Sequence, residues 1–200
     1  MRTLVKDRKG QILKEATRLF SEYGFDKVTI KQLADACAIT EPALYRHYTS
    51  KEAIYDAVLD AIEYRLSSQM FLEKLEGEKD LESLLKSIAQ HVLEFFTENR
   101  DLYRLLLFSA LREHPKAKRV YQVIRGSYVS FLVDQLDRLY EQQLIIQKNN
   151  EITARCFIGM VFDCALNITL WKGFQGKTFK PHEVIANNVP IYVQGLQARS

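Results

Sequence analysis

Apolar residues recur at three- and four-residue spacing along almost the whole chain, which is the pattern of helices that bury one face. The first run ends at Tyr23, and Gly24 follows where a C′ glycine stops a helix. Signals for β-strands are few, and neither an internal repeat nor a low-complexity run interrupts the pattern. These features predict an all-α fold.

The same spacing, combined with helix-start and helix-stop residues, predicts where each helix lies. Three N-terminal capping signals stand in the first quarter of the chain: Thr29-x-x-Gln32, Thr40 and Thr49-x-x-Glu52. His114-Pro115 favours a sharp stop. The expected helices cover residues 6–23, 29 to a break near 38, 40–48, 50–71, 81–97, 101–112, 118–143 and 152–172, and Pro181 opens a final segment.

Size and composition indicate a globular protein. The chain has 200 residues, of which 47% are hydrophobic, so it can bury a core of one domain or of a small and a medium one. An odd number of cysteines without a C-x-x-C pair predicts reduced core thiols, no metal site and a cytoplasmic location. The apolar stretch CFIGMVFDCALNITLW is interrupted by Asp163 and Asn167, and the N-terminus is charged. We therefore expect neither a membrane span nor a secretion signal.

The basic residues are concentrated at the N-terminus. Residues 1–51 hold ten Lys and Arg against six Asp and Glu, a charge of +4, whereas residues 52–200 hold 18 against 19, a charge of −1. This asymmetry predicts that the first quarter contacts a polyanion.

The stretch ITEPALYRHYTSKEAIY, residues 39–55, holds two short helical patterns in direct succession. Leu44 and Tyr48 share one helix face by i,i+4 spacing, which indicates that both are core residues. We expect Tyr48 to pack under the helix of residues 6–23. Lys51 falls in a first helical turn, where a cation opposes the helix dipole. A bound anion would reverse that mismatch.

The stretch TIKQLADACAITEPALYRHYTSKEAIYDAVL, Thr29 to Leu59, is similar to the signature of the TetR family of bacterial transcriptional repressors. The resemblance covers the first quarter of the chain. It implies a three-helix helix-turn-helix DNA-binding domain over residues 1–50 and a helical ligand-binding and dimerisation domain over residues 51–200. It also implies a homodimer, a double-stranded DNA operator and a small, mostly apolar effector, with no cofactor.

The resemblance implies specific DNA contacts. The helix expected over residues 40–48 would lie in the major groove, Thr29 and Lys51 would hold phosphates, and Arg46 is the best candidate to bind a guanine. The expected contact residues are Thr29, Thr40, Glu41, Pro42, Ala43, Tyr45, Arg46, His47 and Lys51. The chain departs from the family at Ala38, where a glycine usually makes the turn. If that turn needs positive φ, alanine costs on the order of 1 kcal/mol.

Each of these residues also has a purely structural interpretation. Arg46 and His47 near a helix C-terminus favour the dipole even without DNA. The basic N-terminal residues Arg2, Lys6, Arg8 and Lys9 are typical of a disordered charged end, and only the neighbouring motif suggests DNA contact.

The C-terminal helices contain the candidates for an effector site. Most of their aromatic residues are core residues by default, and His91 is a candidate core histidine. Asp163 and Asn167 lie on a polar stripe that could be paired, contact a partner subunit or contact an effector. The candidate ligand-binding residues are His91, Phe95, Tyr103, Tyr121, Tyr128, Phe162, Asp163 and Asn167.

The helices expected over residues 118–143 and 152–172 are apolar over more than one stripe, so we expect a second buried surface on them. It could be the core of the same chain or a contact with a partner subunit, for which residues 132–140 are a candidate face. The leading function is a ligand-responsive repressor. An enzyme is disfavoured because the four histidines lie far apart without a nucleophile, phosphate-loop or metal motif. A helix-turn-helix architectural or adaptor protein without an effector remains the alternative.

Overall fold

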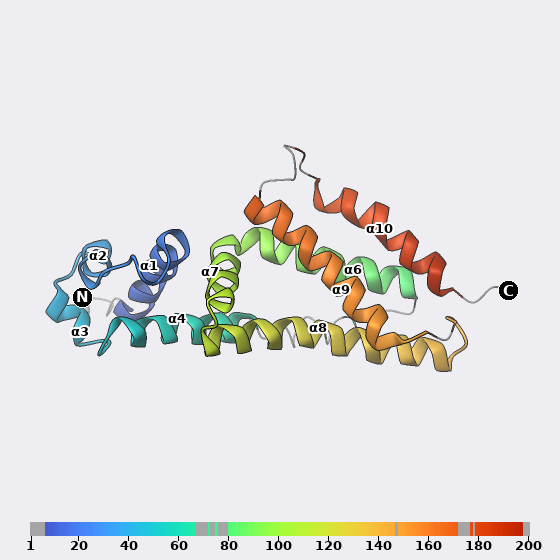
Figure 1. The fold of residues 1–200 in the computed structure, drawn as a ribbon, viewed down its shortest axis with the longest axis horizontal. Coiled ribbons are helices and arrows are strands. Elements are labelled where there is room, and N and C mark those ends of the chain that lie inside the picture. The colour runs from blue at the N-terminus through green and yellow to red at the C-terminus, as the bar shows by residue number, and fades with distance from the viewer. Residues whose placement is uncertain are drawn as a thin grey trace, which may run out of the picture. The chain divides into compact units, whose positions relative to one another are not determined.

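The computed structural model describes residues 7–66, 72, 75, 80–146, 148–171, 177 and 179–197. Its regular elements are helices, and no β-strand occurs among these residues (Figure 1). In chain order they are α1 (Arg8–Tyr23), α2 (Ile30–Ala36), α3 (Glu41–Tyr45), α4 (Lys51–Leu66), α6 (Leu81–Glu98), α7 (Arg100–Leu111), α8 (Pro115–Glu141), α9 (Asn150–Leu166), the π-helix η1 (Asn167–Trp171) and α10 (Pro181–Leu196). The predicted all-α fold is confirmed.

The chain packs as two compact units. The first combines residues 1–66 with residues 101–121, and the second combines residues 67–100 with residues 122–200. The first unit therefore contains α4 and α7 as well as the three N-terminal helices, while α8 contributes to both units. This division concerns packing, and the functional boundary after residue 50 stays a prediction.

In the first unit, α1 is the helix on which α2 and α4 pack. Asp7 caps its N-terminus by accepting a hydrogen bond of 3.0 Å from the amide of Gly10. Ile12, Ala16 and Phe20 are buried on one face, as their spacing predicts. The helix ends at Gly24, whose φ of 80° is a left-handed conformation that glycine adopts readily.

The turn between α2 and α3 is a Schellman motif with an alanine at the left-handed position. The amide of Ile39 donates to the carbonyl of Ala34 and the amide of Ala38 donates to that of Asp35, both at 3.0 Å. Ala38 has a φ of 53°. The turn thus needs the positive φ that a glycine usually supplies, and alanine adopts it here.

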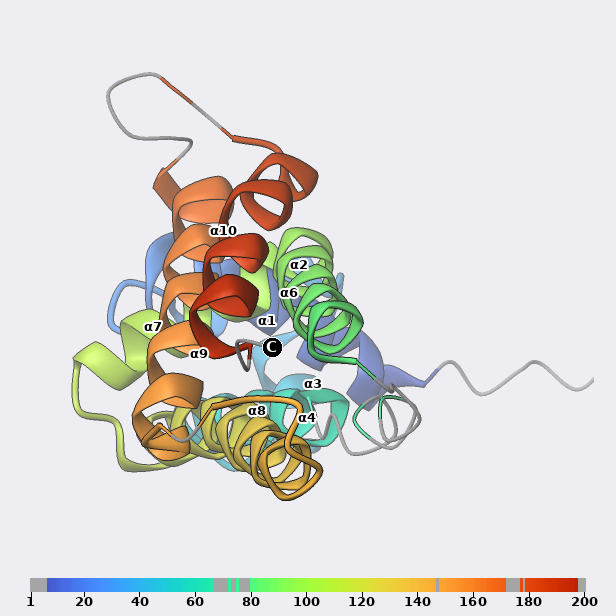
Figure 2. The same ribbon diagram turned by 90° about the vertical axis from the view of Figure 1, so that its right-hand side faces the viewer.

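In the second unit, α6 packs on both α9 and α10 (Figures 1 and 2). Helix α9 and η1 form a stretch, Asn150–Trp171, that is long and apolar enough to cross a membrane by length and composition alone, with a mean hydropathy of 1.4. Six residues of α9 are buried in the protein, as in a core helix of a globular protein: Ala154, Phe157, Ile158, Val161, Phe162 and Ala165.

Several helix ends differ from their predicted positions. Helix α3 ends at Tyr45 instead of 48, and α8 begins at Pro115 instead of 118, because proline fits the first helical turn. The sequence allowed either Thr49 or Ser50 as the start of α4, and the cap is Ser50, whose hydroxyl accepts from the amide of Ala53 at 3.1 Å in place of the Thr49 capping box. The predicted extension of α4 to residue 71 lies outside the described residues.

The structure tests two expectations about burial, one of which was wrong. Cys156 is exposed on α9, whereas Cys37 is buried as a core thiol. Leu132 and Leu136, on the face of α8 expected to meet a partner subunit, are both 0% exposed. These two residues therefore belong to the core of the chain itself, which is one of the two alternatives for this surface, whereas Tyr140 of the same stretch is 41% exposed.

Candidate nucleic-acid interface

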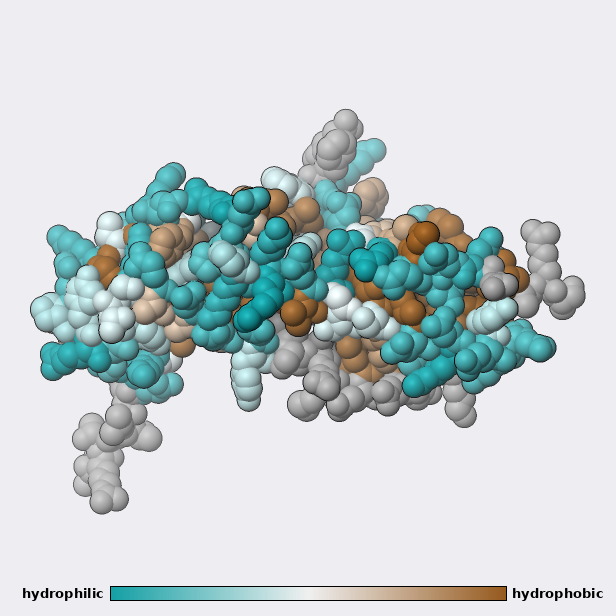
Figure 3. Space-filling model, turned by 60° about the horizontal axis from the view of Figure 1, so that its bottom comes forward, coloured by the Kyte–Doolittle hydropathy of each residue, from teal (hydrophilic) through white to brown (hydrophobic). Residues whose placement is uncertain are grey.

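Helix α3 presents a mostly exposed surface. Leu44 is fully buried and anchors the helix, which confirms its predicted core position. Tyr48 is half-buried, and burial raises the pKa of its phenol. The predicted contact residues Thr40, Glu41, Pro42, Tyr45 and Arg46 are exposed, while Ala43 and His47 are half-buried. On the face shown in Figure 3, hydrophilic surface covers much of the N-terminal helices.

The N-termini of α2 and α3 are both capped by threonine. Thr29 and Gln32 form the predicted capping box, with the Thr29 amide donating to the Gln32 side chain at 2.8 Å and the Thr29 hydroxyl accepting from the Gln32 amide at 3.2 Å. The Thr40 hydroxyl accepts from the Ala43 amide at 3.4 Å. These caps fix the start of each helix, and both threonines keep exposed side chains at these ends.

Lys51 has contacts that the sequence did not indicate. Its ammonium group donates to the carbonyl oxygens of Phe25 at 2.9 Å and Val28 at 3.0 Å, and lies 4.3 Å from the centre of the Phe25 ring. The carbonyl oxygens compensate the positive charge in the first turn of α4. Lys51 therefore ties α4 to the α1–α2 loop, and one of its three N–H donors is left for the predicted phosphate.

Side chains of α1 form hydrogen bonds with the turn before α3. A guanidinium nitrogen of Arg8 and the side-chain amide of Gln11 donate to the carbonyl of Cys37, at 3.5 and 3.4 Å. Arg8 also donates to Gln11 at 2.8 Å. Arg8, expected from the sequence as a charged arm residue, thus has a structural contact with the helix-turn-helix.

The structure brings some of the candidate ligand-binding residues together in the second unit. The ring of His91 lies 6.1 Å from that of Phe95 and 5.9 Å from that of Tyr128, and the Tyr128 ring lies 6.1 Å from that of Phe162. His91 Nδ1 and the Tyr128 hydroxyl form a hydrogen bond of 2.9 Å. Burial lowers the pKa of His91 to about 4, so the imidazole is neutral at pH 7.

The other four candidates stay predictions as ligand-binding residues. Tyr103 and Tyr121 belong to the first unit. Asp163 is exposed on α9 and accepts a hydrogen bond of 3.1 Å from the side chain of Asn167, which also donates to the Asp163 carbonyl. The polar stripe on α9 is thus paired within the helix.

Sequence reasoning also missed a pocket in the first unit. Its walls include Arg104 and Phe108 of α7 and Arg112, which directly follows that helix. These residues follow one another at i,i+4 spacing, which places them on a single helix face, and that spacing could have identified them.

Comparison with known proteins agrees with this arrangement. Residues 12–58 match the family described as bacterial regulatory proteins, tetR family. A nucleoid occlusion factor SlmA of Glaesserella parasuis is 34% identical over 131 residues, which span 64% of each chain. The uncharacterised HTH-type transcriptional regulator YerO of Bacillus subtilis is 31% identical over 147 residues, 71% of this chain and 47% of that protein.

Among solved structures, AibR in complex with isovaleryl coenzyme A and operator DNA has a TM-score of 0.67 at 21% identity, covering 92% of this chain and 97% of that one. This likeness shows that the fold is shared over almost the whole length. The family match from α1 into α4 shows that residues 12–58 belong to the TetR family of bacterial regulatory proteins.

Proposed function

We propose that the protein is a DNA-binding transcriptional regulator that binds a pseudo-palindromic operator through α3. The observation that carries this proposal is the exposed surface of α3, with Tyr45 and Arg46 both exposed at the C-terminal end of a helix that is anchored by the buried Leu44. An aromatic ring and a guanidinium group are suited to the backbone and base edges of the major groove. We also propose that the protein represses transcription and does not activate it.

The experiment is selection of binding sites from random duplexes, followed by affinity measurements with Arg46→Ala. If Arg46 binds a guanine, the variant should lose discrimination at one position per half-site, by roughly 1–3 kcal/mol. Arg138→Ala, at an exposed arginine of α8, is the matched control. Equal losses on selected and random DNA would instead assign Arg46 to the phosphate backbone.

We propose further that the protein acts as a homodimer, so that two copies of α3 enter successive major grooves about 34–36 Å apart. Leu132 and Leu136 of α8 are buried within the single chain, while α8 exposes Val123 and Tyr140, and α9 and α10 also carry exposed apolar side chains. Ile152 is 58% exposed on α9 and Ile191 is 61% exposed on α10. Large exposed aliphatic groups on two packed helices of one unit support a subunit interface.

The cluster of His91, Phe95, Tyr128 and Phe162 is our candidate for the site of a mostly apolar effector. Mass spectrometry of the purified protein would identify a co-purifying small molecule. Its affinity should then fall in the presence of operator, because the coupling between two sites is reciprocal. Equal affinities with and without operator would remove the effector from the proposal.

An architectural role is the second candidate function, because the SlmA relative is named a nucleoid occlusion factor. Mapping of bound sites across the chromosome separates the two roles. A regulator should occupy few sites near promoters, whereas an architectural factor should occupy many sites irrespective of promoters.

A further inference from the structure

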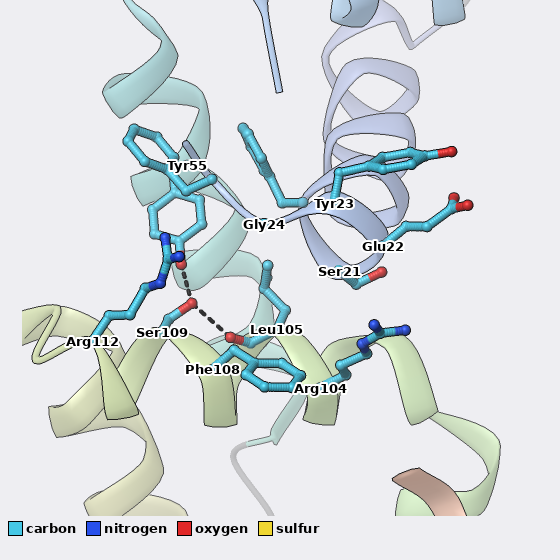
Figure 4. A pocket seen from close by; sticks show the side chains of 12 residues that line it. Ser21, Glu22, Tyr23, Gly24, Tyr55, Arg104, Leu105, Phe108, Ser109 and Arg112 are labelled. Atoms are coloured by element: carbon cyan, nitrogen blue, oxygen red, sulfur yellow. Dashed lines mark hydrogen bonds between the residues drawn. The ribbon is translucent and has the colours of Figure 1, made fainter. Parts of the chain in front are cut away.

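A pocket of about 200 Å³ lies in the first unit, where the end of α1 and the α1–α2 loop meet α4 and α7 (Figure 4). Its walls include Tyr23, Phe25, Tyr55, Arg104, Phe108 and Arg112. All of these residues belong to the N-terminal packing unit. The pocket is therefore separate from the His91 cluster, whose residues lie in the second unit.

Aromatic rings form the apolar part of the pocket. The rings of Phe25 and Tyr55 are packed at 4.8 Å, and Phe20 supports both from behind at 5.8 and 5.2 Å. Tyr23 and Phe108 are 48% and 47% exposed, so ring surface remains open to an incoming group. Exposed rings beside a concave wall are what a flat apolar ligand requires.

The hydroxyl groups at the base of the pocket already have partners. The Tyr55 hydroxyl is hydrogen-bonded to Ser109, and the Ser109 hydroxyl donates to the carbonyl of Leu105 at 2.6 Å (Figure 4). Both residues are buried. These groups rigidify the wall, and a ligand need not satisfy them.

The charges around the pocket leave one cation uncompensated. Glu22 is paired with Arg18 at 3.5 Å, and Arg112 is paired with Asp26 of the α1–α2 loop. Arg104 is half-buried, and among the described residues it has no carboxylate partner. Its guanidinium lies 5.8 Å from the centre of the Phe108 ring. A partly desolvated guanidinium beside an aromatic wall is a site for a carboxylate.

We propose that this pocket binds a small aromatic carboxylate, with its ring against Phe25 and Phe108 and its carboxylate on Arg104. The pocket is large enough for a small aromatic carboxylate, because a cavity of roughly 150 Å³ is enough for a benzene ring. Arg112 also lines the pocket, but its guanidinium is already paired with Asp26. The binding proposal does not depend on the DNA-binding function.

The experiment is calorimetric titration of the DNA-free protein with benzoate, benzyl alcohol and acetate as probes. Benzoate should bind. Benzyl alcohol lacks the carboxylate and acetate lacks the aromatic ring, so each should bind at least roughly tenfold more weakly than benzoate. Arg104→Gln should weaken benzoate by roughly tenfold or more, as loss of a charge-assisted hydrogen bond predicts. Circular dichroism checks that this surface variant is folded.

Arg138→Gln, at an exposed arginine of α8, is the control and should leave benzoate affinity unchanged. A second variant, Phe108→Ala, should weaken benzoate and leave the response to acetate unaltered. Absence of saturable binding by the wild type up to the solubility limit of benzoate would overturn the proposal. Equal benzoate affinity in wild type and Arg104→Gln would overturn it as well.

Discussion

Ala38 holds a left-handed conformation that costs an L-residue with a side chain about 1 kcal/mol or more, yet its turn makes both hydrogen bonds of a Schellman motif. Ala38→Gly should therefore raise the free energy of unfolding by about 1 kcal/mol. The greater conformational entropy of glycine in the unfolded chain reduces this gain. Urea unfolding measures the change. Ala36→Gly, within the last turn of α2, is the matched control and should destabilise by roughly 0.5–1 kcal/mol.

Lys51 combines a structural role with a predicted DNA contact, and the two roles have separate readouts. Lys51→Met removes two hydrogen bonds to loop carbonyls and should destabilise the protein by roughly 1–2 kcal/mol. Loss of a phosphate contact should also lower the slope of log affinity against log salt by about 1, on specific and random DNA alike. An unaltered slope together with lower stability would leave Lys51 as a purely structural residue. Lys31→Met, at an exposed position of α2, is the control.

His91 makes stability depend on pH because its folded pKa of about 4 lies below the unfolded value of 6.5. Between these values the unfolded chain takes up a proton that the folded chain does not, so stability falls as the pH falls from about 6.5 to about 4. After allowance for screening of a half-buried ring, the loss is roughly 1–2 kcal/mol. Glu94, which opposes the shift, is the nearest charge named among its causes.

The measurement is urea unfolding of wild type and His91→Phe at several pH values from about 7.5 to 4. The phenylalanine variant loses the hydrogen bond to Tyr128 and should be less stable at neutral pH. Its stability should nevertheless depend less on pH over this range. Parallel curves for the two proteins would show that His91 is not the titrating group.

At the scale of elements, local sequence signals located most of the helices. The Thr29 box, the Thr40 cap and the stop at Gly24 all occur where residue type predicts them, since each is a local interaction. Pro115 was misread as a stop. Helix α7 ends earlier, through a second Schellman turn with Glu113 at a φ of 59°, and Pro115 opens α8.

Long-range contacts explain what the sequence could not predict about the site. The partners of Lys51 are backbone carbonyls 26 and 23 residues away. Because every residue has a backbone carbonyl, residue type does not indicate such a contact. Residue type did not decide between Ser50 and Thr49 as cap either, because both residues are good caps locally. The burial of the second apolar stripe of α8 was equally invisible, since periodicity does not distinguish a partner subunit from the chain's own core.

At the scale of the whole molecule, the exposed residues of α9 and α10 predict how the protein dimerises. Ile152→Asp should shift sedimentation from roughly twice the chain mass to the chain mass and leave helical content intact, because Ile152 is exposed in the single chain. Leu132→Asp should instead unfold the protein, since Leu132 is fully buried. An Ile152→Asp variant that remains dimeric would exclude this part of α9 from the interface.

The left-handed turns have a consequence for the evolution of the chain. Ala38, Glu113 and Gln143 each occupy the same position after a helix, with φ values of 53°, 59° and 59°, and none is glycine. Their turns share no hydrogen-bonding partner, so gains from glycine at the three positions should be nearly additive, at about 1 kcal/mol each. The chain therefore holds a stability margin that it does not use. Lineages that acquired these glycines could tolerate costly changes in α3, and hence reach new operator sequences, without unfolding.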